Sequence, residues 1–357
     1  GGTIGGSGGL TITGASTWSG GSQIDAGSTS FNGPLTLSGG DLRVVVGRTV
    51  NFGGTTTWTN PGDSTGSFLI ADGATLANSG SFLDQNAFAN SMSNYYGADS
   101  TFVNGGSYTK SGAGTTTIEI GFNNSGSLDV QTGTLRLGGG GSSTGGSVNV
   151  ASGATVEFSG GTHTLTDIVS GGSGTGRLLA SAGTVDSNGT LLFAGTIGAS
   201  GSGLFNFNGA ASASGFEQSG GTIGGSGGLT ITGASTWSGG SQIDAGSTSF
   251  NGPLTLSGGD LRVVVGRTVN FGGTTTWTNP GDSTGSFLIA DGATLANSGS
   301  FLDQNAFANS MSNYYGADST FVNGGSYTKS GAGTTTIEIG FNNSGSLDVQ
   351  TGTLRLG

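Results

Sequence analysis

The chain contains one long sequence unit and a second, partial copy of the same unit. Residues 1–138 recur as residues 220–357 without a substitution, at an offset of 219 positions. Such a period is typical of repeat proteins, in which each repeat buries its apolar face by stacking on its neighbours. We therefore expect a complete tandem unit over residues 1–219 and a partial second unit, identical to residues 1–138, over residues 220–357.

A shorter period runs inside the unit. The stretch GSLDVQTGTLRL (residues 126–137) is followed after about twenty positions by the similar stretch GSVNVASGATVEF (residues 146–158). In both, apolar and polar residues alternate over short segments separated by glycine, which is the pattern of strands with one buried face. The regular spacing favours stacked coils over a series of hairpins. The sequence therefore predicts an all-β fold, a parallel β-solenoid (β-helix) with coils of about 20 residues.

The abundance of glycine predicts how the strands of each coil are connected. It occupies 78 of the 357 positions, whereas proline occurs 4 times and only 8 % of the residues are charged. No Gly-X-Y period is present, and the bursts of Leu, Val, Ile and Phe argue against a disordered chain. Because glycine adopts positive φ angles at little cost, we expect it at tight, Gly-rich corners between the strands.

Charge and hydropathy exclude several classes of partner. The net charge is -11, and the nine Lys and Arg residues form no cluster, so we expect no nucleic-acid binding. No apolar run reaches the length of about 18 residues that a transmembrane segment needs. The absence of cysteine and the acidic, Thr-, Ser- and Asn-rich composition suit a secreted product, so we expect an extracellular or cell-surface location.

One segment of each copy departs from the strand pattern. Residues 84–99, DQNAFANSMSNYYGAD, and their copy at residues 303–318 lack alternation and are expected to be insertion loops, with one short helix as the alternative. Each is either a cap packed over one corner or a contact loop for a neighbouring copy or a glycan, since tyrosine is common at interfaces. The candidate contact residues are Phe88, Met92, Tyr95, Tyr96, Phe307, Met311, Tyr314 and Tyr315.

The residues that could carry chemistry are sparse. The carboxylates are spread along the chain and are expected mostly on outward strand positions or turns, without the clustering that acid–base catalysis requires. His163 is the only histidine and is expected to be an ordinary outward strand residue. We therefore expect no enzyme, no catalytic residues and no cofactor. The calcium-binding nonapeptide is absent, since GGSGTGRLL (residues 171–179) has glycine where the ligand Asp would stand. Weak Ca²⁺ binding at turn residues such as Asp63 and Asp72 stays open.

Three further side chains invite a structural interpretation. Lys110 lies nine positions before Glu119, which suggests a cross-strand or cross-coil ion pair worth under about 1 kcal/mol if exposed, with a lysine–asparagine isopeptide bond as a remote alternative. Trp18 and Trp58 are expected to fill the core, and stacking on sugars is the alternative.

Two long stretches resemble a known class of protein. FNNSGSLDVQTGTLRLGGG (residues 122–140) and GGSVNVASGATVEFSGGTHTL (residues 145–165) are similar to the coils of giant bacterial extracellular β-strand-repeat proteins, such as autotransporter passenger rods and filamentous-haemagglutinin-type adhesins. The resemblance implies a β-solenoid and a role in adhesion, biofilm matrix or surface fibres, and it carries over no catalytic motif.

From the identical units and this resemblance, we expect a structural protein that forms a long extracellular or cell-surface filament. Its partners would be copies of itself or further tandem units. The alternative is an adhesin stalk that binds a glycan or a host or cell surface through the aromatic insertion loop.

Overall fold

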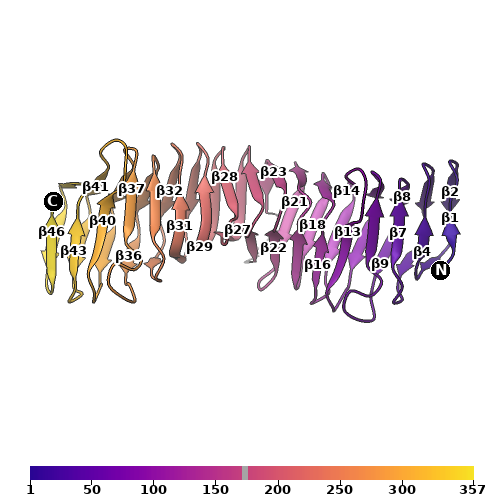
Figure 1. Cartoon of the computed structure of the whole chain (residues 1–357), viewed down its shortest axis with the longest axis horizontal. Helices are drawn as coiled ribbons and strands as arrows, with labels where there is room; N and C mark the ends of the chain where they lie inside the picture. Colours follow the sequence, from indigo (N-terminus) through magenta and orange to yellow (C-terminus); the bar gives the residue numbers. More distant parts are fainter. Residues whose placement is uncertain (171–175) are drawn as a thin grey trace. The chain divides into compact units, whose positions relative to one another are not determined.

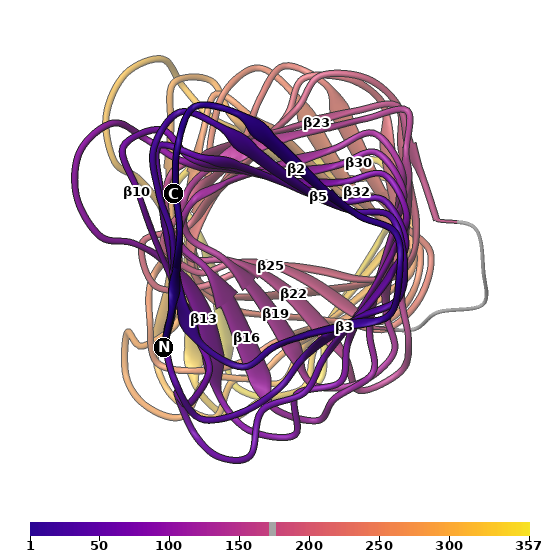
Figure 2. The same ribbon diagram turned by 90° about the vertical axis from the view of Figure 1, so that its right-hand side faces the viewer.

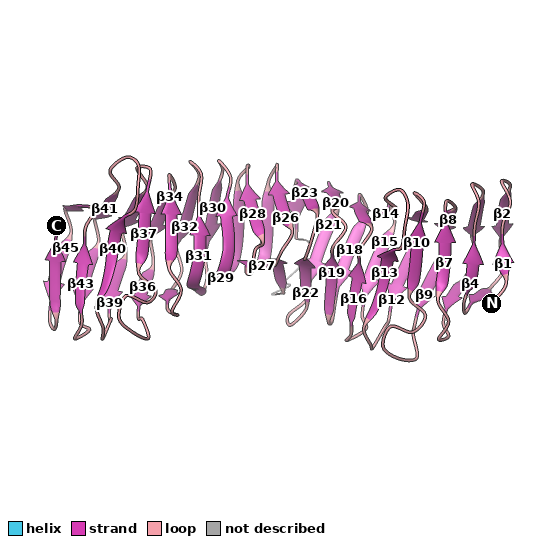
Figure 3. Ribbon diagram, viewed as in Figure 1, coloured by secondary structure: helices cyan, strands magenta, loops and turns pink. Residues whose placement is uncertain are grey.

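The computed structural model describes residues 1–170 and 176–357, and in these residues the chain forms strands, turns and loops but no helix (Figure 3). Accordingly, no helix of the described chain could cross a membrane. The chain divides into two compact bodies, an N-terminal body (Gly1–Leu179) and a C-terminal body (Ala180–Gly357). The division lies inside the 219-residue sequence period and not at its end.

In the N-terminal body, each strand pairs in parallel with the strand three places further along the chain. Three strands therefore form one coil, and three faces of stacked strands result. In Figure 2, β13, β16, β19 and β22 follow one another on one face, and β2 and β5 lie on another. The first face contains β1 (Thr3–Ile4), β4 (Gly21–Gln23), β7 (Arg43–Val46), β10 (Phe68–Ala71), β13 (Asn90–Asn94), β16 (Thr115–Ile118), β19 (Thr134–Leu137) and β22 (Thr155–Phe158).

The other two faces are built in the same way (Figure 1). The second contains β2 (Gly9–Ile12), β5 (Ser28–Phe31), β8 (Thr49–Phe52), β11 (Thr75–Asn78), β14 (Thr101–Asn104), β17 (Gly121–Asn124), β20 (Gly141–Thr144) and β23 (Thr162–Thr166). The third contains β3 (Ser16–Trp18), β6 (Leu35–Leu37), β9 (Thr55–Trp58), β12 (Ser81–Asp84), β15 (Ser107–Lys110), β18 (Ser127–Val130), β21 (Ser147–Val150) and β24 (Ile168–Val169). The division between the bodies falls within β25 (Arg177–Ala180).

The C-terminal body repeats this architecture, with longer strands at its start. β29 has 14 residues and pairs in parallel with β27, β28, β30 and β31. From β31 to β43, each strand again pairs with the third strand after it. The strands are β26 (Thr184–Ser187), β27 (Leu191–Ala199), β28 (Leu204–Phe207), β29 (Ala211–Gly224), β30 (Gly228–Ile231), β31 (Ser235–Gln242), β32 (Ser247–Phe250), β33 (Leu254–Leu256), β34 (Arg262–Val265), β35 (Thr268–Phe271), β36 (Thr274–Trp277), β37 (Phe287–Ala290), β38 (Thr294–Asn297), β39 (Ser300–Asp303), β40 (Asn309–Asn313), β41 (Thr320–Asn323), β42 (Ser326–Lys329), β43 (Thr334–Ile337), β44 (Gly340–Asn343), β45 (Ser346–Val349) and β46 (Thr353–Leu356).

The register of the pairs gives the length of a coil. Ser107 of β15 pairs with Ser127 of β18, twenty positions later. The coils average roughly 21 residues, and the longest separate Thr75 of β11 from its partner Thr101 of β14 by twenty-six. The expected all-β parallel solenoid and its coil length are thus confirmed.

Alternate residues of each strand fill the interior. In β18, Leu128 and Val130 are buried, whereas the residues between and before them are partly exposed. The large aromatic side chains stack between coils, as Phe82 does on Tyr108 with ring centroids 5.3 Å apart. Trp58 is fully buried, which confirms its expected place in the core. A contiguous apolar interior of this kind supplies most of the favourable free energy of folding.

One corner is built from asparagine and glycine. Asn78 donates to the side chain of Asn104 at 2.6 Å, and Asn104 donates to the side chain of Asn124 at the same distance. The glycine two positions after each asparagine follows the same stacking. A Cβ atom on Gly106 would lie 2.1 Å from the carbonyl oxygen of Gly80 in the preceding coil. Glycine is required here because the backbones of successive coils approach too closely for any side chain.

The expectation of an insertion loop at residues 84–99 is wrong for the middle of the segment. Residues 90–94 form β13, which pairs with β10 and β16 and continues the first face, and β40 does the same in the second copy. The strand went unrecognised because its buried positions are Asn90 and Met92, so it lacks the usual alternation of aliphatic and polar residues. Asp84 is the last residue of β12, and residues 85–89 and 95–99 lie outside the strands.

Candidate functional site

The candidate contact residues divide into an exposed and a buried set. Tyr95 and Tyr96 are 62 % and 48 % exposed, and their ring centroids lie 5.0 Å apart. Phe88 is also exposed. Met92, by contrast, is fully buried in β13 and does not belong to any contact surface. The second copy repeats the arrangement, since Tyr314, Tyr315 and Phe307 are exposed, the two tyrosine rings are again 5.0 Å apart, and Met311 is buried.

A polar hollow lies next to the tyrosine pair in the sequence. It has a volume of about 210 Å³ and is lined by Asn94, Asp99, Ser100 and Glu119, among others. The equivalent hollow of the second copy has a volume of about 440 Å³ and is lined by Asn313, Asp318, Ser319 and Glu338. Two carboxylates and an amide offer hydrogen-bond acceptors and donors of the kind that bind hydroxyl groups. The exposed pair Tyr95 and Tyr96 is called the aromatic patch below, with Tyr314 and Tyr315 as its copy. Phe88 precedes β13 and the tyrosines follow it, so Phe88 lies at the other end of that strand.

The two turn aspartates considered for Ca²⁺, Asp63 and Asp72, have structural roles. The Asp63 carboxylate accepts a hydrogen bond from the backbone N–H of Ala89 at 3.0 Å. Asp72 has a φ angle of 52°, a left-handed conformation that aspartate tolerates better than most residues. Among the residues that the structure describes, no three His, Asp or Glu side chains gather closely enough to hold a metal ion. Residues 171–175 of the glycine-rich stretch compared with the calcium nonapeptide lie outside the described residues.

The expectation that His163 points outward is wrong. It lies on β23 with its side chain in the core, only 2 % exposed, and its ring centroid is 5.0 Å from that of Phe158. Burial lowers the pKa of His163 to about 4, because the charged imidazolium loses its hydration there. Its strand pairs with β20, where Gly141, which has no side chain, is the register partner of His163, and the buried Ser143 is the partner of Leu165. The histidine is therefore a neutral core residue at physiological pH.

Buried arginines bind backbone carbonyl groups of the corners. Arg43 donates to the carbonyl oxygens of Trp18 at 2.9 Å, Ser38 at 2.8 Å and Gly66. Burial lowers the pKa of Arg43 to about 10, which still leaves it charged at neutral pH. A guanidinium with five donors can satisfy several carbonyls at once, so this side chain holds successive corners together.

The most concentrated polar chemistry lies inside the solenoid, at Asp84. Its Oδ2 atom accepts hydrogen bonds from the hydroxyl groups of Tyr108 at 3.0 Å and Thr116 at 2.6 Å. Its Oδ1 atom accepts from the backbone N–H of Asn86 at 3.2 Å and from the Asn86 side chain at 2.8 Å. Burial raises the pKa of Tyr108, and the adjacent Asp84 charge and hydrogen bond raise it further. The tyrosine is consequently a permanent donor to this carboxylate.

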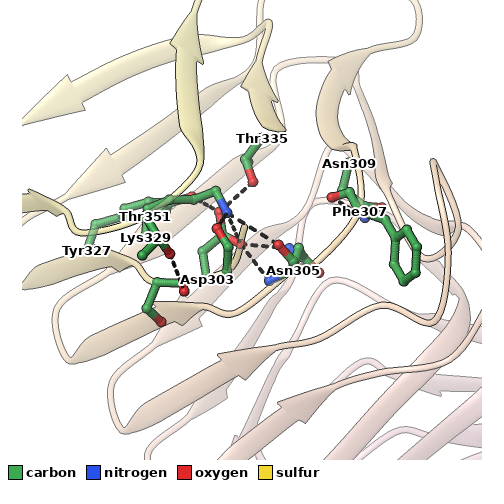
Figure 4. Close-up of polar contacts among 10 residues, drawn as sticks. Asp303, Asn305, Phe307, Asn309, Tyr327, Lys329, Thr335 and Thr351 are labelled. Atoms are coloured by element: carbon green, nitrogen blue, oxygen red, sulfur yellow. Dashed lines mark hydrogen bonds and ion pairs between the residues drawn. The ribbon is translucent and has the colours of Figure 1, made fainter. Parts of the chain in front are cut away.

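Lys110 completes the cluster. Its Nζ atom lies 3.7 Å from Oδ2 of Asp84 and donates to the carbonyl oxygen of Gly112 at 3.0 Å. The expected ion pair with Glu119 is therefore wrong, because Lys110 points into the core and pairs with Asp84, whereas Glu119 lines the surface hollow. Figure 4 shows the second copy, in which Asp303 lies between Lys329, Asn305 and Thr335.

This cluster was missed in the sequence although a signal was present. Asp84 follows Phe82 by two positions in SFLD, and Lys110 follows Tyr108 by two positions in SYTK. Residues two apart on a strand share a face, so each charged residue shares the inward face of an aromatic residue. Charged residues are expected to point outward, because they are almost never fully buried unless paired, and the sequence does not show that these two pair with each other.

Two arrangements thus stand out in the described chain, namely the exposed aromatic patch and the buried cluster around Asp84. Each occurs once in residues 1–138 and again, in the same form, in residues 220–357.

Comparison with known proteins adds no identification, since no protein-family model, curated protein or solved structure matches this chain.

Proposed function

We propose that this chain is a structural segment of a long extracellular or cell-surface filament made of identical tandem β-solenoid units, without a catalytic activity of its own. The observation that carries the proposal is the parallel stacking of coils in both bodies, in which each coil offers its free strand edges as a template for the next. Tandem units of one sequence can extend such a stack without a change of chemistry.

The composition supports this role. Glycine is costly in an isolated domain, at roughly 0.5 to 1 kcal/mol per residue relative to alanine. In a solenoid, the close approach that glycine permits places the backbone of each coil in hydrogen-bonding contact with its neighbour, as where the N–H of Gly106 donates to the carbonyl oxygen of Asn78 at 3.0 Å. The scarcity of Lys and Arg and the net charge of -11 keep such a polymer soluble outside the cell.

Direct imaging of the native assembly tests the filament. We expect extended particles in negative-stain or cryo-electron micrographs, with an axial repeat that corresponds to 219 residues. Separate globular particles that show no tendency to extend would contradict the proposal.

A second candidate function rests on the aromatic patch. Exposed tyrosine rings suit stacking on sugar rings, and the polar hollow, whose lining includes the preceding residue Asn94, offers hydrogen bonds to sugar hydroxyl groups. The chain would then be an adhesin stalk that binds a glycan or a host or cell surface. The patch could instead join neighbouring filaments, because identical copies of the unit place the same aromatic patch at regular intervals along each filament.

Replacing all four tyrosines of the patch by alanine separates these roles. The variant carries Tyr95→Ala, Tyr96→Ala, Tyr314→Ala and Tyr315→Ala, and we expect it to keep its fold because all four side chains are largely exposed. Loss of attachment to cells or to a glycan array with intact filaments supports the adhesin. Loss of lateral bundling supports a filament contact.

The matched control is the pair Leu42→Ala and Leu261→Ala, which removes equally exposed apolar side chains from equivalent positions of the two copies. If the control loses attachment or bundling to the same degree, the patch has no specific role. If the tyrosine variant keeps both properties, neither contact passes through the tyrosines.

A further inference from the structure

Asp84 and Lys110 face each other inside the solenoid with no access to water. They are register partners on the adjacent strands β12 and β15, and both side chains are 0 % exposed. Asp303 and Lys329 form the same pair on β39 and β42, again at 0 % exposure and again with 3.7 Å between nitrogen and the nearest carboxylate oxygen. The same sequence stacked in the same register thus gives the same pair in each body.

A buried ion pair of this kind is a costly way to fill the core. Removing an ammonium and a carboxylate from water costs several kcal/mol per ion, and the attraction between them repays this only in part. Burial lowers the pKa of Lys110, which increases the fraction of neutral, nucleophilic amine, although the Asp84 charge and hydrogen bonding oppose the shift. An amide between the two side chains would replace both buried charges by one neutral group.

We propose that Lys110 and Asp84 join in an intramolecular isopeptide bond, and that Lys329 and Asp303 do the same. Transfer of one proton from the ammonium to the carboxylate yields a neutral amine and a carboxylic acid. The Nζ lone pair then attacks Cγ of the aspartate. The tetrahedral intermediate collapses with loss of one carboxyl oxygen as water, which carries away the acid proton and one proton of Nζ. The products are an amide and one water molecule, and the reaction requires no oxidant, reductant or activated co-reactant.

The neighbouring donors suit this step. The hydroxyl groups of Tyr108 and Thr116 both donate to Oδ2 of Asp84, where they would stabilise the negative charge that develops in the tetrahedral intermediate. The N–H groups of Asn86 donate to Oδ1, the oxygen that would leave as water. The same donors surround Asp303, namely Tyr327, Thr335 and Asn305 (Figure 4). The held geometry supplies the proximity that an uncatalysed condensation lacks.

The bond would tie two successive coils together covalently. It joins strands that are already paired, and it closes the loop of residues 84–110, which removes conformational freedom from the unfolded chain. One cross-link in each copy would oppose the peeling of a coil from the stack under mechanical load. This inference concerns the chemistry of the core and does not depend on the proposed filament.

Intact-mass spectrometry of the whole chain under denaturing conditions tests the bond. Each isopeptide bond removes one water molecule, so we expect a mass about 36 Da below the value calculated from the sequence. Fragmentation of the proteolysed chain should yield a branched peptide in which Lys110 is linked to Asp84. A chain with its full calculated mass overturns the proposal, and a branched peptide linked through Asn86, with loss of ammonia, overturns the assignment of Asp84.

Lysine variants supply the controls. Lys110→Met should restore about 18 Da and leave the second bond intact, Lys329→Met should do the converse, and the double variant should show the full calculated mass. A water loss that persists in the double variant arises elsewhere in the chain, for example at the Asp72–Gly73 sequence, and overturns the proposal. Because the single variants each keep one intact copy, the unaltered site reports on whether the chain has folded.

Discussion

At the scale of the residue, the interior of this solenoid accepts polar and charged side chains that the composition alone does not place. His163, Arg43 and Asp84 are all buried, and the cost of removing each polar side chain from water is offset in a different way. Arg43 satisfies carbonyl oxygens, and Asp84 is surrounded by donors. His163 is accommodated as the neutral imidazole, because burial lowers its pKa to about 4.

The depressed pKa of His163 makes the stability of the N-terminal body dependent on pH. Between about pH 4 and pH 6.5 the unfolded state binds a proton at this histidine and the folded state does not. The free energy of unfolding is therefore highest above about pH 6.5 and falls as the pH is lowered through this range, by at most roughly 3 kcal/mol. Urea unfolding at pH 7.5, 6.0 and 5.0 measures the effect.

The variant His163→Gln is the control for that measurement. Glutamine does not titrate, so the stability of the variant should change little between pH 7.5 and pH 5.0. Carboxylates titrate mainly below this range. A wild-type chain whose stability is the same at these three pH values would contradict the assignment of a buried neutral histidine.

At the scale of the element, the corners determine how the strands stack. The two glycines of the Gly105–Gly106 pair have different surroundings although they are neighbours. A Cβ atom on Gly105 would have its nearest contact at 3.7 Å from Asn78, whereas one on Gly106 would lie 2.1 Å from the carbonyl oxygen of Gly80. A contact of 2.1 Å to backbone cannot be relieved by a side-chain rotation, so the stacked corners themselves would have to separate.

Single alanine substitutions at these two glycines should therefore have unequal effects. We expect Gly106→Ala to lower the free energy of unfolding by more than about 2 kcal/mol, because it forces two coils apart at the corner. Gly105→Ala should change it by less than about 0.5 kcal/mol. Denaturant unfolding of the two variants against the wild type measures both values, and equal losses would show that the corner has room for a side chain.

At the scale of the whole molecule, two identical sequences have different burial because their neighbours differ. Leu10 on β2 is 39 % exposed, whereas its copy Leu229 on β30 is fully buried. Among the described strands, β2 pairs only with β5, whereas β30 pairs with both β29 and β32. Burial of a given residue thus depends on a coil on each side of it, as expected for a quasi-one-dimensional fold.

The same substitution in the two copies should reveal this dependence. We expect Leu229→Ala to lower the free energy of unfolding by about 2–5 kcal/mol, as for other buried leucines. Leu10→Ala should cost less than about 1 kcal/mol, because much of its side chain already contacts water. Midpoints of urea unfolding compare the two single variants directly. Equal shifts would contradict stabilisation by coils on both sides.

The features set by local sequence are those that repeat at short range. Alternation within LTL, SLDV or TVEF identifies strands, glycine identifies corners, and the recurrence of these phrases about every twenty residues predicts parallel coils, because all three depend on backbone geometry within a few residues. These short-range patterns correctly predicted the fold class and the burial of Trp58 in the core.

Tertiary structure alone decided which polar residues lie inside and what they contact. Asn90 and Met92 form a strand because β10 and β16 supply pairing edges on both sides, and Lys110 meets Asp84 because the register places them opposite each other. Such neighbours are more than twenty positions apart, and their distance depends on the lengths of the intervening corners, which vary from coil to coil. The alternation of a strand distinguishes two faces, but only the stacked coils determine what each face meets.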